Sequence, residues 1–279
     1  MKESRIPKLL QEIPDAPAQL YIRGQFPDQE KYTFLTVIGA RKCTTYGKQV
    51  CEHLIKGLRG YPIVIVSGLA LGIDSIAHQA ALDNKLTTIA VPGSGLDDSV
   101  LYPASNRALA QSILASDGCL ISEFEPLFRA TNWSFPKRNR IMAGMSHAVL
   151  VIEAENKSGT RITARLATEY NRDVLSVPGS IFSSLSEGTN ELIREGATPV
   201  KNAHDILDQL GLLNDSVPVQ QTLNLEPDEQ KIIDLLSEPK SRNQISTESK
   251  LPIIQLNILL SSMEIKGIIK EQLGKMYRL

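Results

Sequence analysis

Short apolar runs alternate with helical patterns between residues 33 and 180. The runs cover residues 33–40, 62–68, 87–93, 118–124, 147–154 and 174–180. Each run is too continuous in Val, Ile and Leu for a strand with one wet face, so each predicts a strand buried on both faces of a parallel sheet. Helical signals lie between them, in residues 47–58, 73–82, 105–115, 140–144 and 161–170. This alternation predicts an α/β fold with a Rossmann-like, doubly wound and mostly parallel sheet.

Glycine-bearing turns end several of the predicted strands, namely Gly39, Gly68, Gly93 and Gly179. In an open parallel sheet the ligand lies outside the carboxyl ends of the strands. We therefore expect these turns to converge on one surface, which is the candidate functional surface.

The pattern changes on both sides of this region. Residues 1–32 are predicted to be a short N-terminal extension, and residues 33–212 the Rossmann-like domain. Residues 213–226 are polar and lack a helical period, which indicates a linker. Residues 227–279 predict three helices and two short strands that turn at Leu273 and Gly274, the pattern of a small C-terminal winged-helix domain.

The overall composition indicates a globular protein, with 42% hydrophobic and 22% charged residues. The apolar runs are shorter than the roughly 18 residues that a membrane helix needs, and the first residues lack a signal-peptide pattern, so a cytoplasmic location without membrane contact is expected. Three cysteines without CxxC spacing and four scattered histidines predict neither a disulfide framework nor a metal site.

Charge is distributed unevenly along the chain. The formal net charge is −1, yet residues 129–172 contain eight basic and three acidic residues. A local basic excess indicates a polyanionic partner. Phe128, Trp133 and Phe135 lie in or beside the same segment, and aromatic rings next to cations suit the binding of single strands.

Candidate anion sites follow the predicted strands. Arg41 comes just after the first strand, and Ser158, Gly159 and Thr160 open a helix whose positive end attracts anions. The dinucleotide fingerprint is incomplete, because Asp98 stands where its third glycine belongs, and no Walker A motif is present. Hydrolysis of nucleoside triphosphates is therefore disfavoured.

Structural interpretations of the same residues stay open at this point. Arg138 and Asn139 can cap a helix and bridge to Glu123 or Glu125. Trp133 and Phe135 can be core residues, which is the commoner fate of aromatic side chains. Asp74 is more typical of a helix N-terminus than of a catalytic acid.

Eight segments together resemble the DNA-processing protein A family (DprA, also called Smf) over residues 15–212. In order they are GAR, SGLALGIDSIAHQAAL, IAVPGSGLDDSVLYPASNRALA, SEFEP, FPKRNRIMAGMS, VIEAENKSGTRITARLA, VLSVPGS and EGTNELIREGA. The resemblance implies a homodimeric protein that binds and protects single-stranded DNA and loads the RecA recombinase during natural transformation. It implies neither a catalytic activity nor a cofactor.

The resemblance also implies site residues. Arg41 matches the family's phosphate-gripping arginine, residues 137–140 match its FPxRNR element, and Phe135 can stack a base. The complete predicted DNA-binding set is Gly39, Arg41, Ser67, Gly68, Phe135, Lys137, Arg138, Asn139, Arg140, Ser158, Gly159, Thr160 and Thr163.

This chain departs from the family pattern at two places, because Ala40 replaces the serine of the common GSR motif and the N-terminal extension is too short for an additional helical domain. The predicted recognition helix, residues 252–267, carries one charge of each sign, so we expect the winged helix to serve protein contacts or domain packing.

Two other functions remain as alternatives. One is a small-nucleotide enzyme or sensor similar to phosphoribohydrolases, although Glu169 lies too far beyond Thr160 to match their PGGxGTxxE motif. The other is a structural interaction module, which predicts no nucleic-acid binding.

Overall fold

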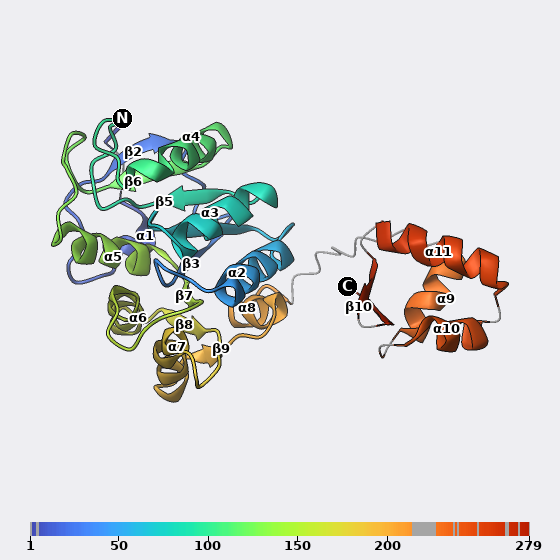
Figure 1. Cartoon of the computed structure of the whole chain (residues 1–279). Coiled ribbons are helices and arrows are strands. Elements are labelled where there is room, and N and C mark those ends of the chain that lie inside the picture. Colours follow the sequence, from blue (N-terminus) through green and yellow to red (C-terminus); the bar gives the residue numbers. More distant parts are fainter. Residues whose placement is uncertain are drawn as a thin grey trace. The chain divides into compact units, whose positions relative to one another are not determined.

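The computed structural model describes residues 2–3, 6–213, 227–236, 238, 240–249, 251–265, 268–272 and 274–278. The chain forms two compact units, residues 1–217 and 218–279 (Figure 1). Of the predicted linker, all residues except Leu213 lie outside the described part of the chain. No helix among the described residues has the length and apolar character needed to cross a bilayer.

One sheet organises the first unit, and in the described residues it has nine strands in the order β1-β2-β6-β5-β4-β3-β7-β8-β9. The strands are β1 (Lys2–Glu3), β2 (Tyr21–Gly24), β3 (Thr33–Ile38), β4 (Ile63–Ser67), β5 (Thr88–Ala90), β6 (Cys119–Ser122), β7 (Ala148–Val151), β8 (Asp173–Ser176) and β9 (Thr198–Pro199). Strands β3 to β9 pair in parallel, which confirms the predicted α/β fold and its six central strands.

Helices cover both faces of this sheet (Figure 1). They are α1 (Lys8–Gln11), α2 (Thr45–Gly57), α3 (Ile73–Asp83), α4 (Arg107–Ala115), α5 (Ser134–Met145), α6 (Gly159–Glu169), α7 (Ser184–Arg194) and α8 (Ala203–Gln209), with a 3₁₀ turn at Ala104–Asn106. Successive side chains of a strand point to opposite faces. Phe34 and Val64 therefore pack in one core with residues of α1, α5 and α6, while Leu35 and Ile65 pack in the other with residues of α2, α3 and α8.

The described residues before β3 pack against the sheet. Strand β2 pairs antiparallel with β6 along its whole length, and Leu10, Ile13 and Leu20 are buried in the core shared with α5 and α6. The residues predicted as a short N-terminal extension thus belong to the same compact unit as the Rossmann-like domain. The sequence pattern was weak here because β2 is short and has one fully buried residue, Ile22, whereas the central strands are buried on both faces.

The strand order reverses between β3 and β7. From β3 the chain adds β4, β5 and β6 on one side, and it then returns to place β7 on the other side of β3. The loop after β3 leads to α2 on one face of the sheet, and the loop after β7 leads to α6 on the other face. Because the two loops diverge, a crevice opens at the carboxyl ends of β3 and β7.

The second unit has its own core. Its described elements are α9 (Pro227–Leu235), α10 (Arg242–Ser249), α11 (Ile253–Ile265) and an antiparallel pair, β10 (Ile269–Gln272) and β11 (Lys275–Arg278). Ile232, Ile245, Leu256 and Met276 are buried together. These helices and the hairpin are the elements predicted for a winged helix.

A buried histidine makes the first unit sensitive to acid. The Nδ1 atom of His78 lies 2.7 Å from the Thr88 hydroxyl oxygen, and because that hydroxyl donates to the Ile65 carbonyl, His78 is the donor. Its Nε2 atom is buried without a partner. Burial lowers the pKa of His78 to about 3. In the unfolded chain the pKa of a histidine is near 6.5, so on acidification His78 binds a proton in the unfolded state before it does so in the folded state. The free energy of unfolding therefore falls as the pH drops below about 6.5.

We predict that lowering the pH from 7 to 5 costs roughly 2 kcal/mol of folding free energy through His78. Urea unfolding of the wild type and the His78→Gln variant at both pH values measures this, and the variant should lose less stability on acidification. His204→Gln, which removes an exposed histidine of α8, is the control. Equal pH dependence of His78→Gln and wild type contradicts the prediction.

Candidate functional site

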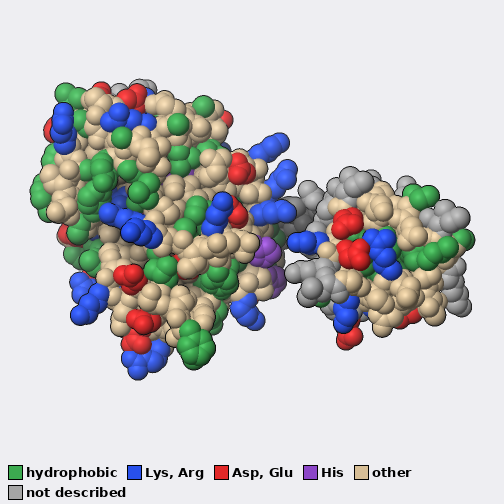
Figure 2. Space-filling view, viewed as in Figure 1, with side chains coloured by type: hydrophobic (Ala, Val, Ile, Leu, Met, Phe, Trp, Pro, Cys, Tyr) green, Lys and Arg blue, Asp and Glu red, His purple; other side chains and the backbone are tan. Residues whose placement is uncertain are grey.

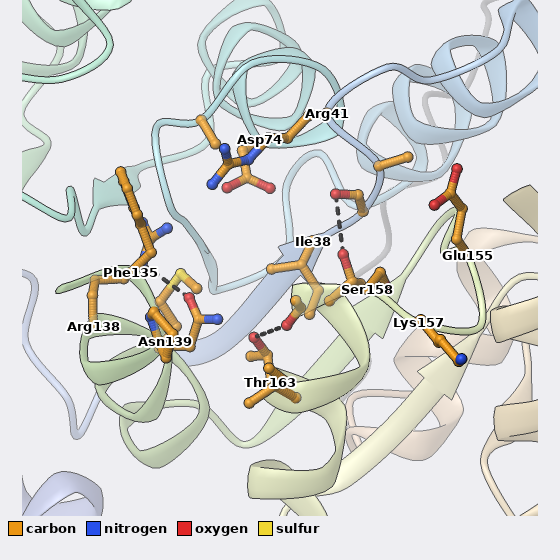
Figure 3. Close-up of a pocket in the computed structure, with 18 of the residues that line it drawn as sticks. Ile38, Arg41, Asp74, Phe135, Arg138, Asn139, Glu155, Lys157, Ser158 and Thr163 are labelled. Carbon is orange, nitrogen blue, oxygen red and sulfur yellow. Dashed lines mark hydrogen bonds between the residues drawn. The ribbon is translucent and has the colours of Figure 1, made fainter. Parts of the chain in front are cut away.

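A pocket of about 600 Å³ occupies the crevice at the carboxyl ends of β3 and β7. Its walls come from the loop after β3, from one side of α5, and from the loop after β7 with the first turns of α6 (Figure 3). The predicted residues that line it are Gly39, Arg41, Phe135, Arg138, Asn139, Ser158, Gly159, Thr160 and Thr163. The fold thus brings together three segments that are far apart in the sequence.

The amino end of α6 faces this pocket without an internal cap. Ser158 occupies the N-cap position in an extended conformation, but its side chain makes no capping bond and its Oγ atom has no partner. Thr160 ties the helix to the end of β3 by donating from Oγ1 to the Gly39 carbonyl at 3.2 Å. No acidic residue lies in the first turn. Unpaired N–H groups and the helix dipole make this end a site for an anion.

Helix α5 begins at Ser134, six residues earlier than predicted. The serine hydroxyl donates to the Gly93 carbonyl at 2.6 Å and so fixes the start of the helix to the end of β5. Pro136 stands in the first turn of α5, where its missing N–H would have no intrahelical acceptor anyway. The cations of FPKRNR are therefore inside the helix and do not precede it.

Helical periodicity separates the residues of FPKRNR onto two faces. Phe135, Arg138 and Asn139 line the pocket, as expected for positions three and four apart. Lys137 and Arg140 do not line it; both lie by Glu123. The structure therefore brings Arg138 and Asn139 to the pocket and places Lys137 and Arg140 beside Glu123.

Arg138 is buried and binds the protein itself. Its side chain is 4% exposed and donates to the carbonyl oxygens of Gly68, at 2.5 Å, and Val91. The Asp74 carboxylate accepts the Gly68 N–H at 3.1 Å and balances the arginine charge. Burial raises the pKa of Asp74 and lowers that of Arg138, while the opposite charge of each partner opposes both shifts. Arg138 thus clamps the ends of β4 and β5 and makes no bridge to Glu123 or Glu125.

Arg140 makes the ion pair with Glu123, at 2.5 Å between Nη2 and Oε2, and is nearly buried. Lys137 lies 3.6 Å from the same carboxylate and stays half exposed. Ser67 is fully buried and donates to the Val37 carbonyl at 2.6 Å. Ser67, Gly68, Arg138 and Arg140 are thus engaged with other parts of the protein, and these contacts shape the site.

The exposed cations of the pocket come from its loops. Arg41 is exposed, and its guanidinium carbon lies 5.2 Å from the centroid of the Phe135 ring (Figure 3). Lys42 and Lys157 line the same pocket and are also exposed. Figure 2 shows a group of Lys and Arg side chains bordered by hydrophobic ones on the face that carries α5. Cations next to an aromatic ring are thus present on this face.

The predicted set lacks five polar residues that line the pocket: Lys42, Asp74, Asn132, Glu155 and Lys157. Lys42 and Lys157 are each adjacent in sequence to a predicted residue, Arg41 and Ser158 respectively. Position in a loop that follows a central strand was the available signal. Of the five, Asp74 is engaged with Gly68 and Arg138.

Comparison with known proteins identifies the family. The model of the family described as DNA recombination-mediator protein A matches residues 1–211. The chain belongs to this family. The DNA processing protein DprA of Streptococcus pneumoniae is 45% identical over 198 residues, which are 71% of this chain and 68% of the relative. Protein Smf of Synechocystis is 34% identical, with 98% of this chain and 77% of the relative covered.

Solved structures of relatives have the same fold. DprA from Streptococcus pneumoniae superposes with a TM-score of 0.67 at 43% identity, covering 72% of this chain and 70% of that chain. DprA from Helicobacter pylori gives a TM-score of 0.67 at 34% identity, covering 75% of this chain and 94% of that chain. Family membership assigns this DprA relative a DNA-processing, recombination-mediator role and does not favour the phosphoribohydrolase alternative.

Gly68 and Gly159 differ in the space around their Cα atoms. A Cβ atom on Gly68 overlaps Arg138 Nη1 and Asp74 Oδ2, whereas one on Gly159 meets no heavy atom within 4 Å. We predict that Gly68→Ala costs roughly 1–3 kcal/mol, the range for overpacking a well-packed site, and that Gly159→Ala leaves stability unchanged. Thermal unfolding followed by circular dichroism measures both. A Gly68→Ala protein as stable as wild type shows that Arg138 is not held as described.

Proposed function

We propose that this protein binds single-stranded DNA in the pocket between β3, α5 and α6. The observation that carries the proposal is the exposed Arg41 guanidinium beside the Phe135 ring, in a crevice that also receives the amino end of α6. The solved structure of DprA from Helicobacter pylori describes a single-stranded DNA binding mode for that protein. The similarity of this chain to it in sequence and fold supports single-stranded DNA as the ligand here.

Phosphate and base are held by different parts of the pocket. Arg41, Lys42 and Lys157 supply positive charge, and the first N–H groups of α6 supply donors without charge. Gly159 has open space around its Cα, so a phosphate can approach the backbone there. Phe135 offers a ring for one base, and stacking of this kind contributes about 1–3 kcal/mol per base.

The same arrangement selects against a duplex. A base reaches Phe135 only when it has left its partner strand, because the paired bases of a duplex are stacked on one another. The exposed cations of the pocket, Arg41, Lys42 and Lys157, and the backbone N–H groups of α6 contact phosphates, which carry no information on base identity. We therefore propose a strand-specific but sequence-tolerant binder.

From the resemblance to DprA we also propose that the protein protects incoming strands and loads the RecA recombinase onto them. We further propose that it is a homodimer, lies in the cytoplasm and has no catalytic role. The contacts of Asp74, the buried carboxylate of the pocket, support the proposal of no catalytic role. It accepts the Gly68 N–H and compensates the charge of Arg138, so its place in the pocket has a structural explanation.

Substitutions in the pocket test DNA binding. Arg41→Ala should weaken binding to all sequences alike and should reduce the log-log salt slope by about 0.7, the value for one phosphate contact on a single strand. Gly159→Ala should weaken binding at unchanged stability, because the added methyl group blocks the backbone. Fluorescence anisotropy of a labelled oligo-dT across a salt series measures both, with duplex DNA and RNA as competitors.

Lys31→Ala is the matched control, since it removes an exposed cation next to the amino end of β3, away from the pocket. If Arg41→Ala and Lys157→Ala both bind oligo-dT as tightly as wild type, the pocket is not the DNA site.

We propose that the predicted winged-helix domain, residues 227–279, serves protein contacts or domain packing. Helix α11 exposes Ile253 and Ile258, apolar side chains that phosphate contacts do not use. A fragment of residues 227–279 should therefore bind no duplex DNA at physiological salt, which a gel shift measures. Duplex binding by this fragment overturns the proposal.

A further inference from the structure

Trp133 is a large aromatic side chain that the fold leaves exposed to solvent. It stands at the N-cap position of α5, two residues before Phe135, and is 55% exposed. It is also the single tryptophan of the chain. The structure therefore contradicts the interpretation of Trp133 as a core residue. Tryptophan is highly buried on average, so an exposure of this size is unusual for the residue type.

Two phenylalanines hold the Trp133 ring in one orientation. Its centroid lies 5.7 Å from that of Phe124, with an interplanar angle of 79°, and 5.6 Å from that of Phe128, with an angle of 63°. Phe124 and Phe128 are stacked at 4.5 Å, and Phe124 is buried. These edge contacts are favourable aromatic geometries. The exposed part of the tryptophan is thus presented from a rigid base.

The backbone beneath Trp133 is equally fixed. Ser134, the next residue, is fully buried and donates to the carbonyl oxygens of Gly93 and Thr131, and it accepts the Thr131 N–H at 3.0 Å. The segment that carries the ring is therefore tied to the end of β5. A platform prepared in this way loses little conformational entropy when a flat ligand stacks on it.

A cation accompanies the ring. The Lys137 Nζ atom lies 5.8 Å from the Trp133 centroid and 5.6 Å from that of Phe124. Its carboxylate neighbour, Glu123, is held more closely by Arg140, at 2.5 Å compared with 3.6 Å for Lys137. Lys137 is 47% exposed and is the more weakly held of the two cations. An aromatic face with an accessible ammonium group beside it matches one base and one phosphate.

The ring lies next to the pocket along the chain. Asn132 precedes Trp133 and lines the pocket, and Phe135 lines it from the first turn of α5. The Cα atoms of residues 133 and 135 are about 5–6 Å apart, as expected for helical backbone. A strand that leaves the pocket past Asn132 and around the start of α5 therefore reaches Trp133 within a short stretch of chain.

We propose that Trp133, with Lys137, forms a second base-stacking site for a single strand that extends beyond the pocket. The proposal rests on the proposed function and adds a specificity for length: short oligonucleotides fill the pocket alone, and longer ones also engage Trp133. Lys137, which does not line the pocket, then binds a phosphate of this longer strand. Leu127 is 67% exposed in the loop before Trp133, so a protein partner on this face is the competing occupant that the experiment must distinguish.

The single tryptophan reports directly on stacking. Wild-type protein is titrated with labelled oligo-dT of about 4 and about 12 nucleotides, with anisotropy and tryptophan emission recorded on the same samples. Both lengths should raise the anisotropy, and only the longer one should quench the emission. An oligonucleotide of the longer length with abasic sites should bind more weakly and quench less.

Substitution provides the second readout. Trp133→Ala should weaken binding of the longer oligonucleotide by roughly 5-fold to 100-fold and leave the shorter one unchanged, while Trp133→Phe should keep most of the affinity. Lys137→Ala should weaken the longer one and flatten its salt slope. Tyr32→Ala, which removes a 38% exposed ring next to the amino end of β3, is the matched control and should change neither.

The outcomes separate this inference from the proposed function. Absence of any anisotropy change with wild type overturns the proposed function and this inference with it. Binding of both lengths, with unchanged tryptophan emission and wild-type affinity of Trp133→Ala and Trp133→Phe, overturns the second stacking site and leaves the pocket in place. In that case the exposed ring belongs to a protein contact. If a variant fails to fold, the tryptophan emission of the wild-type protein still shows whether a base stacks on Trp133.

Discussion

The buried guanidinium of Arg138 is the constraint on which the site depends. The carbonyl oxygens of Gly68 and Val91 come after β4 and β5, and Arg138 donates to both. A buried charge costs several kcal/mol unless it is paired and fully bonded, and Asp74 supplies the opposite charge. Because two strand ends and α5 meet at one planar group, the floor of the pocket has a fixed shape. The loop residues above it can then bind a flexible ligand without the fold having to move.

Helix α5 divides its sequence between support and recognition. One face presents Phe135 and Asn139 to the pocket, and the other directs Arg140 to Glu123. A cation that neutralises a nearly buried carboxylate is not available to a phosphate, so the count of basic residues in this segment overstates its binding capacity. The free positive charge of the pocket comes instead from the loops after β3 and β7. Recognition therefore depends on the reversal of strand order that brings these loops together.

Sequence reasoning located the crevice because its physical cause is local. Strands buried on both faces have unbroken apolar runs, and the loops that follow them carry Arg41 and Gly159. It failed where the cause is distant. The partners that bury Arg138 and Arg140 are Asp74 and Glu123, which lie outside the segment whose charges were counted. It also failed for β2, because a short strand with one buried residue has little apolar pattern to recognise.

The small number of free cations has a consequence for how the protein holds its ligand. Three exposed cations, Arg41, Lys42 and Lys157, line the pocket, so counterion release on a single strand corresponds to a slope of only about 2. A chain with a net charge of −1 gains little from long-range attraction. Affinity must then come mainly from contacts that salt does not screen, which are backbone N–H groups at α6 and aromatic rings. On this argument rigid rings such as Phe135 and Trp133 matter more to binding than additional lysines, and they require the bases to be unpaired.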